Sequence, residues 1–344
     1  MTPVISTTTT SIDPIARSRS LAPARVLVTG AAGLLGRELA ATLATGGQAV
    51  RGIDLAEPGP RWPPDRWVSG DLRSDDACRQ ACDGVSAVIH AAARQHHSRM
   101  PRRGRERFFH ANVTMTRTIL RAAVEAGVGH FIDVSSDMVY GMPRGRPFVE
   151  TDVPCPIGPY GRSKLEGEAV CAAARGRSLI VTILRPRLIV GPGRLGVLTR
   201  LFDRVRRGRA VPVFGPGHHR YQMVAVADVA SACAMALARP CDGVLNLGSD
   251  DPPTVRELLG DLCRRAGTTS RIVSMPCGAA NAALWALHAV RLAPLSPEQF
   301  RIAGADYVLD TTRAREQLGW RPRFSDAEML WQAYRAYLET LGAR

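Results

Sequence analysis

The sequence predicts an α/β protein of the Rossmann type: a doubly wound parallel sheet joined to a smaller, mixed but mostly helical C-terminal substrate lobe. Three observations predict this fold. Short β-rich runs alternate with helical stretches through the first half of the chain. A glycine-rich turn directly follows the first run. The length of 344 residues also exceeds the ~250 to 300 residues at which one hydrophobic core stops growing, so a second lobe is expected.

The predicted strands are five runs in the first half of the chain and one later run. They span residues 25–29, 49–53, 87–90, 130–135, 179–184 and 243–247. Because helical stretches separate them, crossover connections make the strands parallel. We expect a Rossmann domain over 23–185, a sheet completed by about 222–248, and a substrate lobe over 186–341. Residues 1–22 have no apolar core and are expected to form a disordered tail.

The charge of the chain is strongly positive, at +14, but it is evenly distributed. Arginines occur along the whole sequence rather than in one basic arm, which disfavours nucleic-acid binding. Lys164 is the only lysine, so the other 44 of the 45 basic residues are arginine.

Cysteine spacing and hydropathy exclude two further classes of protein. The eight cysteines form no C-x-x-C pair and have no histidine at zinc spacing, so we expect free, mostly buried thiols and no metal. No segment reaches the ~20 apolar residues of a membrane span. The most apolar helix candidate, Ala279 to Val290, is expected to be buried, with an apolar wall of the substrate site as the alternative. A cytoplasmic protein is the expectation.

The glycine-rich turn has the spacing G-x-x-G-x-x-G and connects the first strand to a helix. Glycines in this context allow a tight turn and let backbone N–H groups approach a pyrophosphate at the positive end of the helix. An ordinary glycine-rich loop is the alternative. The predicted dinucleotide-binding residues are Gly30, Gly33, Leu34, Leu35 and Gly36.

Asp54 ends the second strand, where a carboxylate can bind the ribose hydroxyls of an adenosine. It would repel a 2′-phosphate, which favours NAD over NADP. Arg37 and Arg51 lie close enough in sequence to weaken this preference, and a simple turn residue is the alternative for Asp54.

Two motifs suggest acid–base chemistry at an oxygen atom. Tyr160 and Lys164 are four residues apart at the start of a predicted helix and so share a face. The free phenol has a pKa of about 10, and a neighbouring ammonium stabilises the phenolate so that it serves as a base near neutral pH. Ser136 follows a predicted strand and offers a hydroxyl to the same oxygen, although a turn or helix cap is the alternative.

Together these motifs resemble the extended short-chain dehydrogenase/reductase superfamily, in its NAD-dependent epimerase/dehydratase branch, over roughly residues 24–340. Further marks of the resemblance are Gly70-Asp71-Leu72, His90-Ala91-Ala92-Ala93, Asn112-Val113, Val139-Tyr140-Gly141 and Leu318-Gly319-Trp320-Arg321-Pro322.

The resemblance implies roles for these residues. Asp71 and Leu72 would flank the adenine, and Ala91, Ala92 and Ala93 would line the dinucleotide. Asn112 would hold the active-site helix and the nicotinamide end, completing a catalytic set with Ser136, Tyr160 and Lys164. Tyr160 and Lys164 would also contact the cofactor. The resemblance further implies a homodimer through the helices containing residues 112–126 and 160–174.

Departures from the family pattern concern the substrate. The sugar-nucleotide dehydratases carry an acidic pair after the Ser/Thr, whereas Met138 follows Asp137 here, so dehydration is disfavoured. Arg187 stands near the position where 4-epimerases usually carry an asparagine. Arg187 and Arg220 are expected to meet a substrate phosphate. The arginine-rich stretch Arg94 to Arg107 either faces the same anionic substrate or is a solvated surface.

The sequence favours epimerisation of a sugar nucleotide through a transient ketone, with Tyr160 removing the hydroxyl proton and NAD taking the hydride. The alternative is a net NAD(P)-dependent oxidoreductase acting on a lipid or polyketide alcohol or ketone, because Leu184-Arg185-Pro186 and Gly191-Pro192-Gly193 resemble hydroxysteroid-dehydrogenase-like members. A non-catalytic nucleotide sensor is a third hypothesis.

Overall fold

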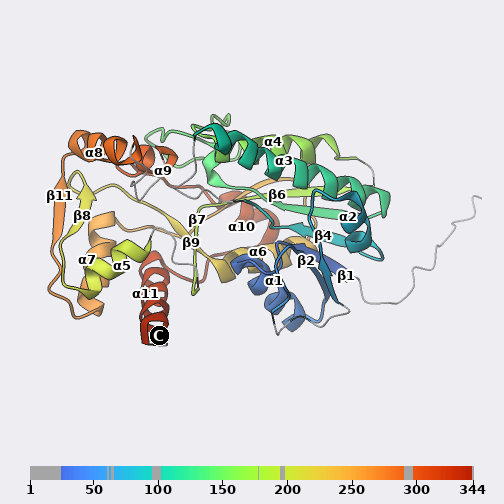
Figure 1. Ribbon diagram of the computed structural model, residues 1–344, viewed down its shortest axis with the longest axis horizontal. Helices are drawn as coiled ribbons and strands as arrows, with labels where there is room; N and C mark the ends of the chain where they lie inside the picture. The colour runs from blue at the N-terminus through green and yellow to red at the C-terminus, as the bar shows by residue number, and fades with distance from the viewer. Residues whose placement is uncertain are drawn as a thin grey trace, which may run out of the picture.

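The computed structural model describes residues 25–59, 62, 66–94, 102–176, 178–193, 198–289 and 297–342, with the backbone alone over 102–108. The expected N-terminal tail and most of the stretch from Arg94 to Arg107 lie outside these described side chains. A sheet domain and a second lobe are visible in Figure 1.

The central sheet has seven parallel strands in the order β10-β6-β5-β4-β1-β2-β3. The order reverses between β1 and β4, and in such sheets the ligand crevice lies beyond the carboxyl ends of the strands at this point. The strands are β1 (Arg25–Thr29), β2 (Ala49–Asp54), β3 (Trp67–Ser69), β4 (Ala87–His90), β5 (His130–Val134), β6 (Ile180–Pro186) and β10 (Gly243–Leu247).

The six predicted strands are confirmed to within two residues at each end. Strand β3 was not predicted, because its three residues are too few to show a period. The Rossmann-type fold class is likewise confirmed.

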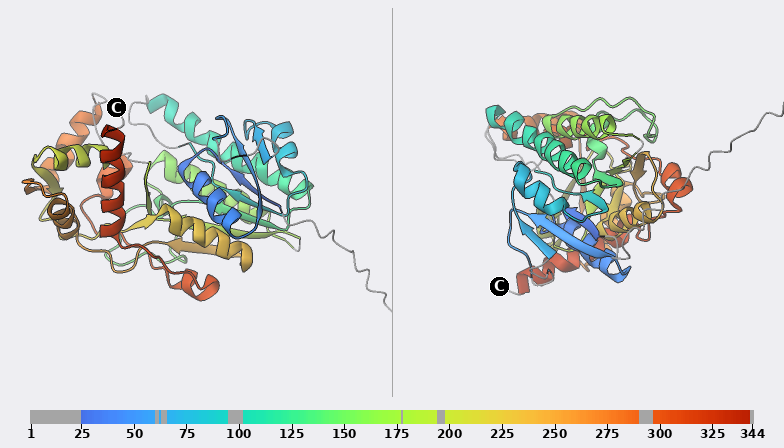
Figure 2. Two further views of the ribbon diagram at one scale, coloured as in Figure 1. Left: turned by 90° about the horizontal axis from the view of Figure 1, so that it is seen from below. Right: turned by 90° about the vertical axis from the view of Figure 1, so that its right-hand side faces the viewer.

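Helices cover both faces of the sheet (Figures 1 and 2). Along β1, Val26 and Val28 belong to the core cluster beneath α1 (Leu34–Thr45) and α6 (Val226–Ala238). Leu27 belongs to the cluster on the opposite face. This alternation follows from the two-residue period of a strand buried on both sides. The opposite face carries α2 (Asp75–Cys82), α3 (Arg102–Glu125) and α4 (Pro159–Ala173).

The second lobe is mostly helical, and it holds two small parallel sheets. Strand β7 (Leu188–Val190) pairs with β9 (Met223–Ala225), and β8 (Val211–Phe214) pairs with β11 (Ile272–Met275). The remaining helices of the second half are α5 (Leu198–Arg206), α7 (Val255–Arg265), α8 (Cys277–Ala289), α9 (Pro297–Ile302), α10 (Thr312–Leu318) and α11 (Asp326–Gly342). In the first half, the 3-10 turn η2 (Asp137–Val139) follows β5.

The chain returns to the sheet domain before its last helix. The indole of Trp320 is fully buried in the cluster beneath α6, and its Nε1 donates a hydrogen bond to the carbonyl of Asp228 at 3.0 Å. The motif containing Leu318 and Trp320 therefore fastens the C-terminal segment to α6.

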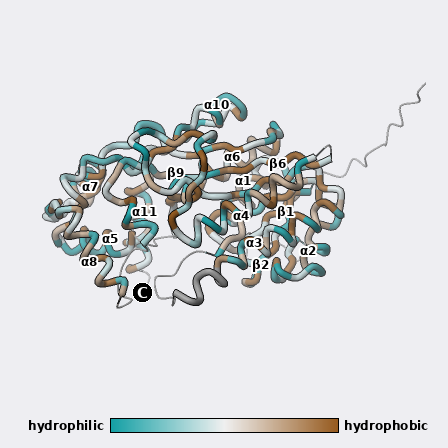
Figure 3. The backbone as a smooth tube through the Cα atoms, turned by 90° about the horizontal axis from the view of Figure 1, so that it is seen from above, coloured by the Kyte–Doolittle hydropathy of each residue, from teal (hydrophilic) through white to brown (hydrophobic). Residues whose placement is uncertain are grey.

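Helix α8 corrects one expectation from the sequence. The apolar stretch from Ala279 was expected to be buried, but within α8 only Ala280 and His288 are buried, and Trp285 and Leu287 are exposed. The helix lies at the edge of the second lobe, away from the central sheet (Figure 3). Hydropathy indicates that the apolar side chains of such a helix favour burial. It does not show that other residues of the same chain bury them.

Candidate active site

A cavity of about 210 Å³ lies at the carboxyl ends of the central strands. Ser136 and Tyr160 both line it, as does Leu35 from the first turn of α1. The second lobe contributes Tyr221 and Glu298 to the same wall. The structure therefore brings the two predicted oxygen-binding residues together at the interface between the sheet domain and the lobe.

The glycine turn is packed too tightly for side chains. Gly30 has φ +68°, and a Cβ there would lie 2.8 Å from the Cα of Ala92. A Cβ on Gly36 would lie 2.6 Å from the Cα of Ala31. Gly33 begins α1 without a side-chain cap, so no side chain of this residue competes for the first-turn N–H groups. This cradle fits the pyrophosphate of a dinucleotide.

Asp54 closes the same cradle from the end of β2. Its Oδ2 accepts a hydrogen bond from the backbone N–H of Ala32 at 3.0 Å. Arg51 is turned away, because its Nη1 donates to the carbonyls of Gln80, Ala81 and Asp83 at the end of α2. Arg37 donates to the carbonyl of Ala32 and stays beside the glycine turn. Of the two arginines that weakened the NAD preference, only Arg37 lies at the cradle.

The two residues expected at the adenine lie differently from one another. Asp71 is held by Arg73, whose guanidinium lowers the pKa of this carboxyl through a side-chain hydrogen bond. The side chain of Leu72 is buried in the core cluster on the α2 side of the sheet. The backbone of Leu72, and not its side chain, is therefore available to contact the adenine.

A buried network supports the turn at Ala91 to Ala93. The ring of His90 contacts Thr29 Oγ1 through Nδ1 at 2.8 Å and Thr116 Oγ1 through Nε2 at 3.0 Å. Burial, assisted by the charge of Lys164, lowers the pKa of His90 to about 3, so the imidazole is neutral. Thr29 Oγ1 also accepts the N–H of Ala92 at 3.2 Å. The sequence did not indicate these contacts, because they join β1, β4 and α3.

Asn112 joins the turn after β4 to the active-site helix. Its Oδ1 accepts the N–H of Arg94 at 2.7 Å, and its Nδ2 donates to Ser163 Oγ at 3.2 Å. Ser163 in turn donates to the carbonyl of Tyr160 at 2.8 Å. Asn112 therefore connects the turn after β4 to the first turn of α4 through Ser163.

Tyr160 lies in the first turn of α4, and Lys164 lies one turn further on. Pro159 begins this helix, where its missing N–H has no intrahelical partner to lose. The side chain of Lys164 is buried, with the residue 4% exposed. Its positive charge opposes protonation of His90, which ends β4, and favours ionisation of Asp133 in β5.

Ser136 caps the short turn η2. Its Oγ accepts the N–H of Met138 at 3.2 Å and donates to Asp137 Oδ1 at 3.0 Å. The neighbouring Ser135 has a different partner, the carboxylate of Glu168, which is paired with Arg185 in the interior. Of the two serines, Ser136 alone is positioned by a group that also lines the cavity.

Arg187 is already neutralised by the protein. It is 3% exposed, and its Nη1 donates to Asp137 Oδ2 at 2.6 Å. The guanidinium lies 4.1 Å from the ring centre of Tyr221 and 4.3 Å from that of Tyr307. The sequence did not indicate that Tyr221 and Tyr307 pack against Arg187, because the three residues are far apart along the chain.

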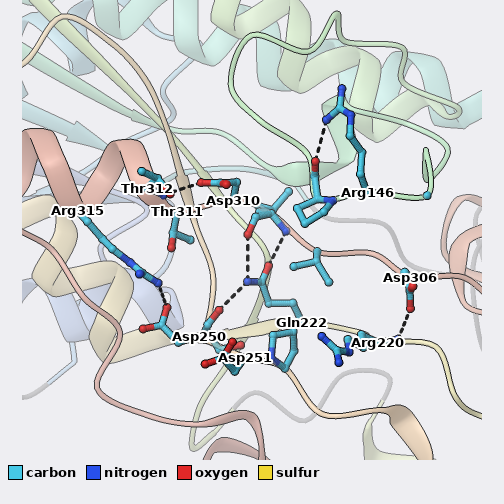
Figure 4. A pocket seen from close by; sticks show the side chains of 16 residues that line it. Arg146, Arg220, Gln222, Asp250, Asp251, Asp306, Asp310, Thr311, Thr312 and Arg315 are labelled. Carbon is cyan, nitrogen blue, oxygen red and sulfur yellow. Dashed lines mark hydrogen bonds and ion pairs between the residues drawn. The ribbon is translucent and has the colours of Figure 1, made fainter.

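Arg220 does not join Arg187. It lines a second pocket, of about 360 Å³, together with Asp250, Asp306 and Arg315 (Figure 4). Successive residues of an extended chain point to opposite sides, so Tyr221 faces the catalytic cavity while Arg220 faces this second pocket. The two expected phosphate ligands therefore do not converge on one site.

The electrostatics of the cavity differ from those of the whole chain. Among the described residues that line it, Arg187 is positive, whereas Asp137 and Glu298 are negative. Much of the remaining wall is apolar, including Leu35, Val134 and Ile189. The reacting end of the substrate therefore meets no excess of positive charge.

Three further properties belong to the described part of the chain. It contains no cluster of three or more His, Cys, Asp or Glu side chains suited to a metal ion. None of its helices is both long and apolar enough to cross a membrane. All eight cysteines are free, and Cys155 and Cys277 are exposed.

Comparison with known proteins places this geometry in a family. The model of the NAD dependent epimerase/dehydratase family matches residues 26–248. An uncharacterised protein of Sinorhizobium fredii, y4nG, is 36% identical over 90% of this chain and 78% of its own length. A dTDP-glucose 4,6-dehydratase of Streptomyces niveus is 31% identical over 91% of this chain and 92% of its own.

A solved structure shows the same fold. The UDP-glucose 4-epimerase of Thermotoga maritima, with UDP-glucose, aligns with a TM-score of 0.75 and 26% identity, over 92% of this chain and 99% of the epimerase. The match of the family model to more than half of the chain agrees with the glycine cradle and the Ser136, Tyr160 and Lys164 arrangement. This chain therefore belongs to the NAD dependent epimerase/dehydratase family and is an enzyme of that family with NAD as its cofactor.

Proposed function

We propose that the protein epimerises a secondary alcohol of a sugar nucleotide through a transient ketone. The observation that carries this proposal is that Ser136 and Tyr160 line one cavity, with Lys164 one helical turn behind Tyr160. The likeness to an epimerase bound to UDP-glucose supports the substrate class. An uncharged sugar ring suits a cavity without excess positive charge.

The residues of the chain divide the acid–base work. Tyr160 accepts the hydroxyl proton as the ketone forms and returns it afterwards, and the Lys164 ammonium stabilises the phenolate in between. The Ser136 hydroxyl turns from Asp137 to the substrate oxygen, where it stabilises developing charge. When bound in the glycine turn beside Asp54, NAD would supply the reversible hydride chemistry at the substrate carbon that allows the centre to be inverted.

The site residues disfavour dehydration. Both oxygens of Asp137 are engaged, one by Ser136 and one by Arg187. Met138, the next residue, has no proton to give or take. The neighbourhood of Ser136 therefore lacks the acidic pair that the elimination of water would require.

The phosphates of the proposed substrate would be bound by residues other than Arg187. Asp137 neutralises this arginine, and the rings of Tyr221 and Tyr307 both pack against its guanidinium. A phosphate that approached Arg187 would meet Asp137 and Glu298 in the same cavity. In place of the sequence expectation, we assign Arg187 to positioning.

A net oxidoreductase is the second candidate, and the apolar cavity wall favours it. The two functions differ in how they treat the cofactor, since an epimerase keeps NAD through both half-reactions and a dehydrogenase releases it. Freshly purified protein is therefore denatured and the released nucleotide measured. Stoichiometric NAD supports the epimerase, whereas an empty protein stabilised by added NADH supports the oxidoreductase.

Tyr160→Phe tests the chemistry itself. The epimerase hypothesis predicts loss of turnover on a panel of UDP- and dTDP-hexoses, followed by NMR, because the variant has no phenolic proton acceptor. The thermal shift caused by NADH should persist. Tyr334→Phe makes the same change in the core of the second lobe and serves as the control. Unchanged turnover in Tyr160→Phe would exclude this mechanism, and unchanged biological activity without turnover would favour the nucleotide sensor.

A further inference from the structure

Helix α4, which carries Tyr160, receives no cap from its own first residues. Its N-cap residue is Gly158, which has no side chain, and its first turn contains no aspartate or glutamate. Pro159 follows without an N–H, and the N–H of Tyr160 lies too close to the start of the helix to find a carbonyl within it. Helices commonly satisfy this N–H with a Ser, Thr, Asp or Asn side chain at the N-cap. In α4 the acceptor comes from another part of the chain.

The carboxylate of Glu298 takes the place of the missing cap. Its Oε1 accepts a hydrogen bond from the N–H of Tyr160 at 3.4 Å. It also fills the space where a side chain of Gly158 would begin, since a Cβ there would lie 1.9 Å from Glu298 Cδ. Glu298 is 9% exposed, and its negative charge lies at the positive end of α4. The absence of a side chain at Gly158 therefore makes room for a cap from a distant residue.

Glu298 belongs to the second lobe, whereas α4 belongs to the sheet domain. It lies on α9, which is fixed to its own lobe by Phe300, a buried side chain whose ring centre is 5.2 Å from that of Trp285. Glu298 and the next residue, Gln299, line the same cavity as Tyr160. Helix α9 therefore contacts both the space for the substrate and the backbone of the proton acceptor.

We propose that Glu298 is a positioning residue for Tyr160: by capping α4 from the second lobe, it holds the phenol beside Ser136 in the cavity. This inference rests on Tyr160 as the proton acceptor, a role that the epimerase and the net oxidoreductase share. The cap needs an oxygen acceptor rather than a charge. Glu298→Gln keeps the oxygen and should keep Tyr160 in place, whereas Glu298→Ala removes it and lets the first turn of α4 open.

The backbone N–H of Tyr160 can be observed directly, without any turnover. The chain has six tyrosines, so protein labelled with ¹⁵N-tyrosine gives six tyrosine amide signals, and the one missing from Tyr160→Phe belongs to Tyr160. In Glu298→Ala we expect this N–H to exchange with water about fivefold faster, the effect of losing a typical cap. Glu298→Gln should restore the slower rate. An unchanged rate in Glu298→Ala would overturn the proposal.

A matched control removes a cap elsewhere in the second lobe. The carboxylate of Glu257 accepts the N–H of Thr254 at 2.9 Å and caps α7. Glu257→Ala should therefore leave the exchange rate of the Tyr160 N–H unchanged. Faster exchange at Tyr160 in this variant would mean that any lost cap loosens α4, and it would contradict a specific role for Glu298.

A compensating variant tests capping as the cause. Glu298→Ala vacates the space beside Gly158, and serine is a preferred N-cap residue. Gly158→Ser combined with Glu298→Ala should therefore restore slow exchange at Tyr160. Gly158→Ser alone should displace the Glu298 side chain, because the two would overlap. Failure of the double variant to recover, with its NADH thermal shift intact, would show that Glu298 acts in another way.

Turnover separates positioning from substrate contact. In Glu298→Ala we expect kcat to fall about fivefold while KM stays within about twofold, and Glu298→Gln should recover kcat. A raised KM with unchanged kcat would make Glu298 a substrate contact and overturn the proposal. Full turnover in Tyr160→Phe would instead refute the proposed function, and the amide exchange rates would still decide whether Glu298 caps α4.

Discussion

The Asp137–Arg187 pair makes a quantitative prediction about stability. Asp137→Asn keeps the shape of the side chain but removes the charge that faces Arg187 at 2.6 Å. Both groups are buried, so the guanidinium would remain in the interior without its counter-ion. Breaking a buried pair in this way costs about 3 to 5 kcal/mol. Because the rings of Tyr221 and Tyr307 still flank the cation, we expect the lower end, about 3 kcal/mol.

The double variant separates the charge effect from the loss of shape. Asp137→Asn combined with Arg187→Met removes both charges and should recover most of the lost stability, to within about 1 to 2 kcal/mol of the unmodified protein. Urea denaturation of the two single variants, the double variant and the unmodified protein gives the coupling free energy. A loss below about 1 kcal/mol in Asp137→Asn, or additive losses in the double variant, would refute the structural role assigned to the pair.

Three other predictions test separate parts of the molecule. Gly36→Ala should lower the affinity for NADH, because the added Cβ would lie 2.6 Å from Ala31 Cα. A Cβ at Gly278 has no atom within 4 Å, so Gly278→Ala should leave the affinity for NADH unchanged and serves as the control. Fluorescence titration should show that the protein binds NADH more tightly than NADPH, and Asp54→Ala should reduce this difference in affinity. Tighter binding of NADPH than of NADH by the unmodified protein would contradict the NAD preference. Burial raises the pKa of Asp133 to about 6, so the folded state binds this proton more tightly than the unfolded state. The stability that the proton contributes is complete below about pH 4 and is lost as the pH rises through 6; Asp133→Asn should remove this decline in urea denaturation, and an unchanged decline would exclude Asp133 as its source.

Local patterns were sufficient where neighbouring residues carry the signal. The strands of the sheet, the glycine turn and the Tyr160–Lys164 spacing each depend on a few consecutive positions, and the structure places them as expected. The same is true of Asp54, whose position at the end of β2 follows from the length of that strand. Such elements are predictable because backbone geometry alone brings their members together.

Contacts between distant segments were not predictable in this way. Arg187 was expected to meet a phosphate, yet Asp137, Tyr221 and Tyr307 enclose it from three separate parts of the chain. Arg220 has the right charge, but the extended chain before β9 places it on the other side from Tyr221. Composition reports that a charge is present, and only the fold decides which group neutralises it and which way it faces.

The buried position of Lys164 also makes the protein a selective chemical reporter. As the sole lysine, it provides the only side-chain amine in the chain, and the fold leaves 4% of it exposed. An acylating reagent should therefore modify a lysine only when α4 separates from the sheet or the cavity opens. The rate of that single modification, followed by mass spectrometry, would measure how often the active site opens in the native protein, with no competing lysine to obscure it.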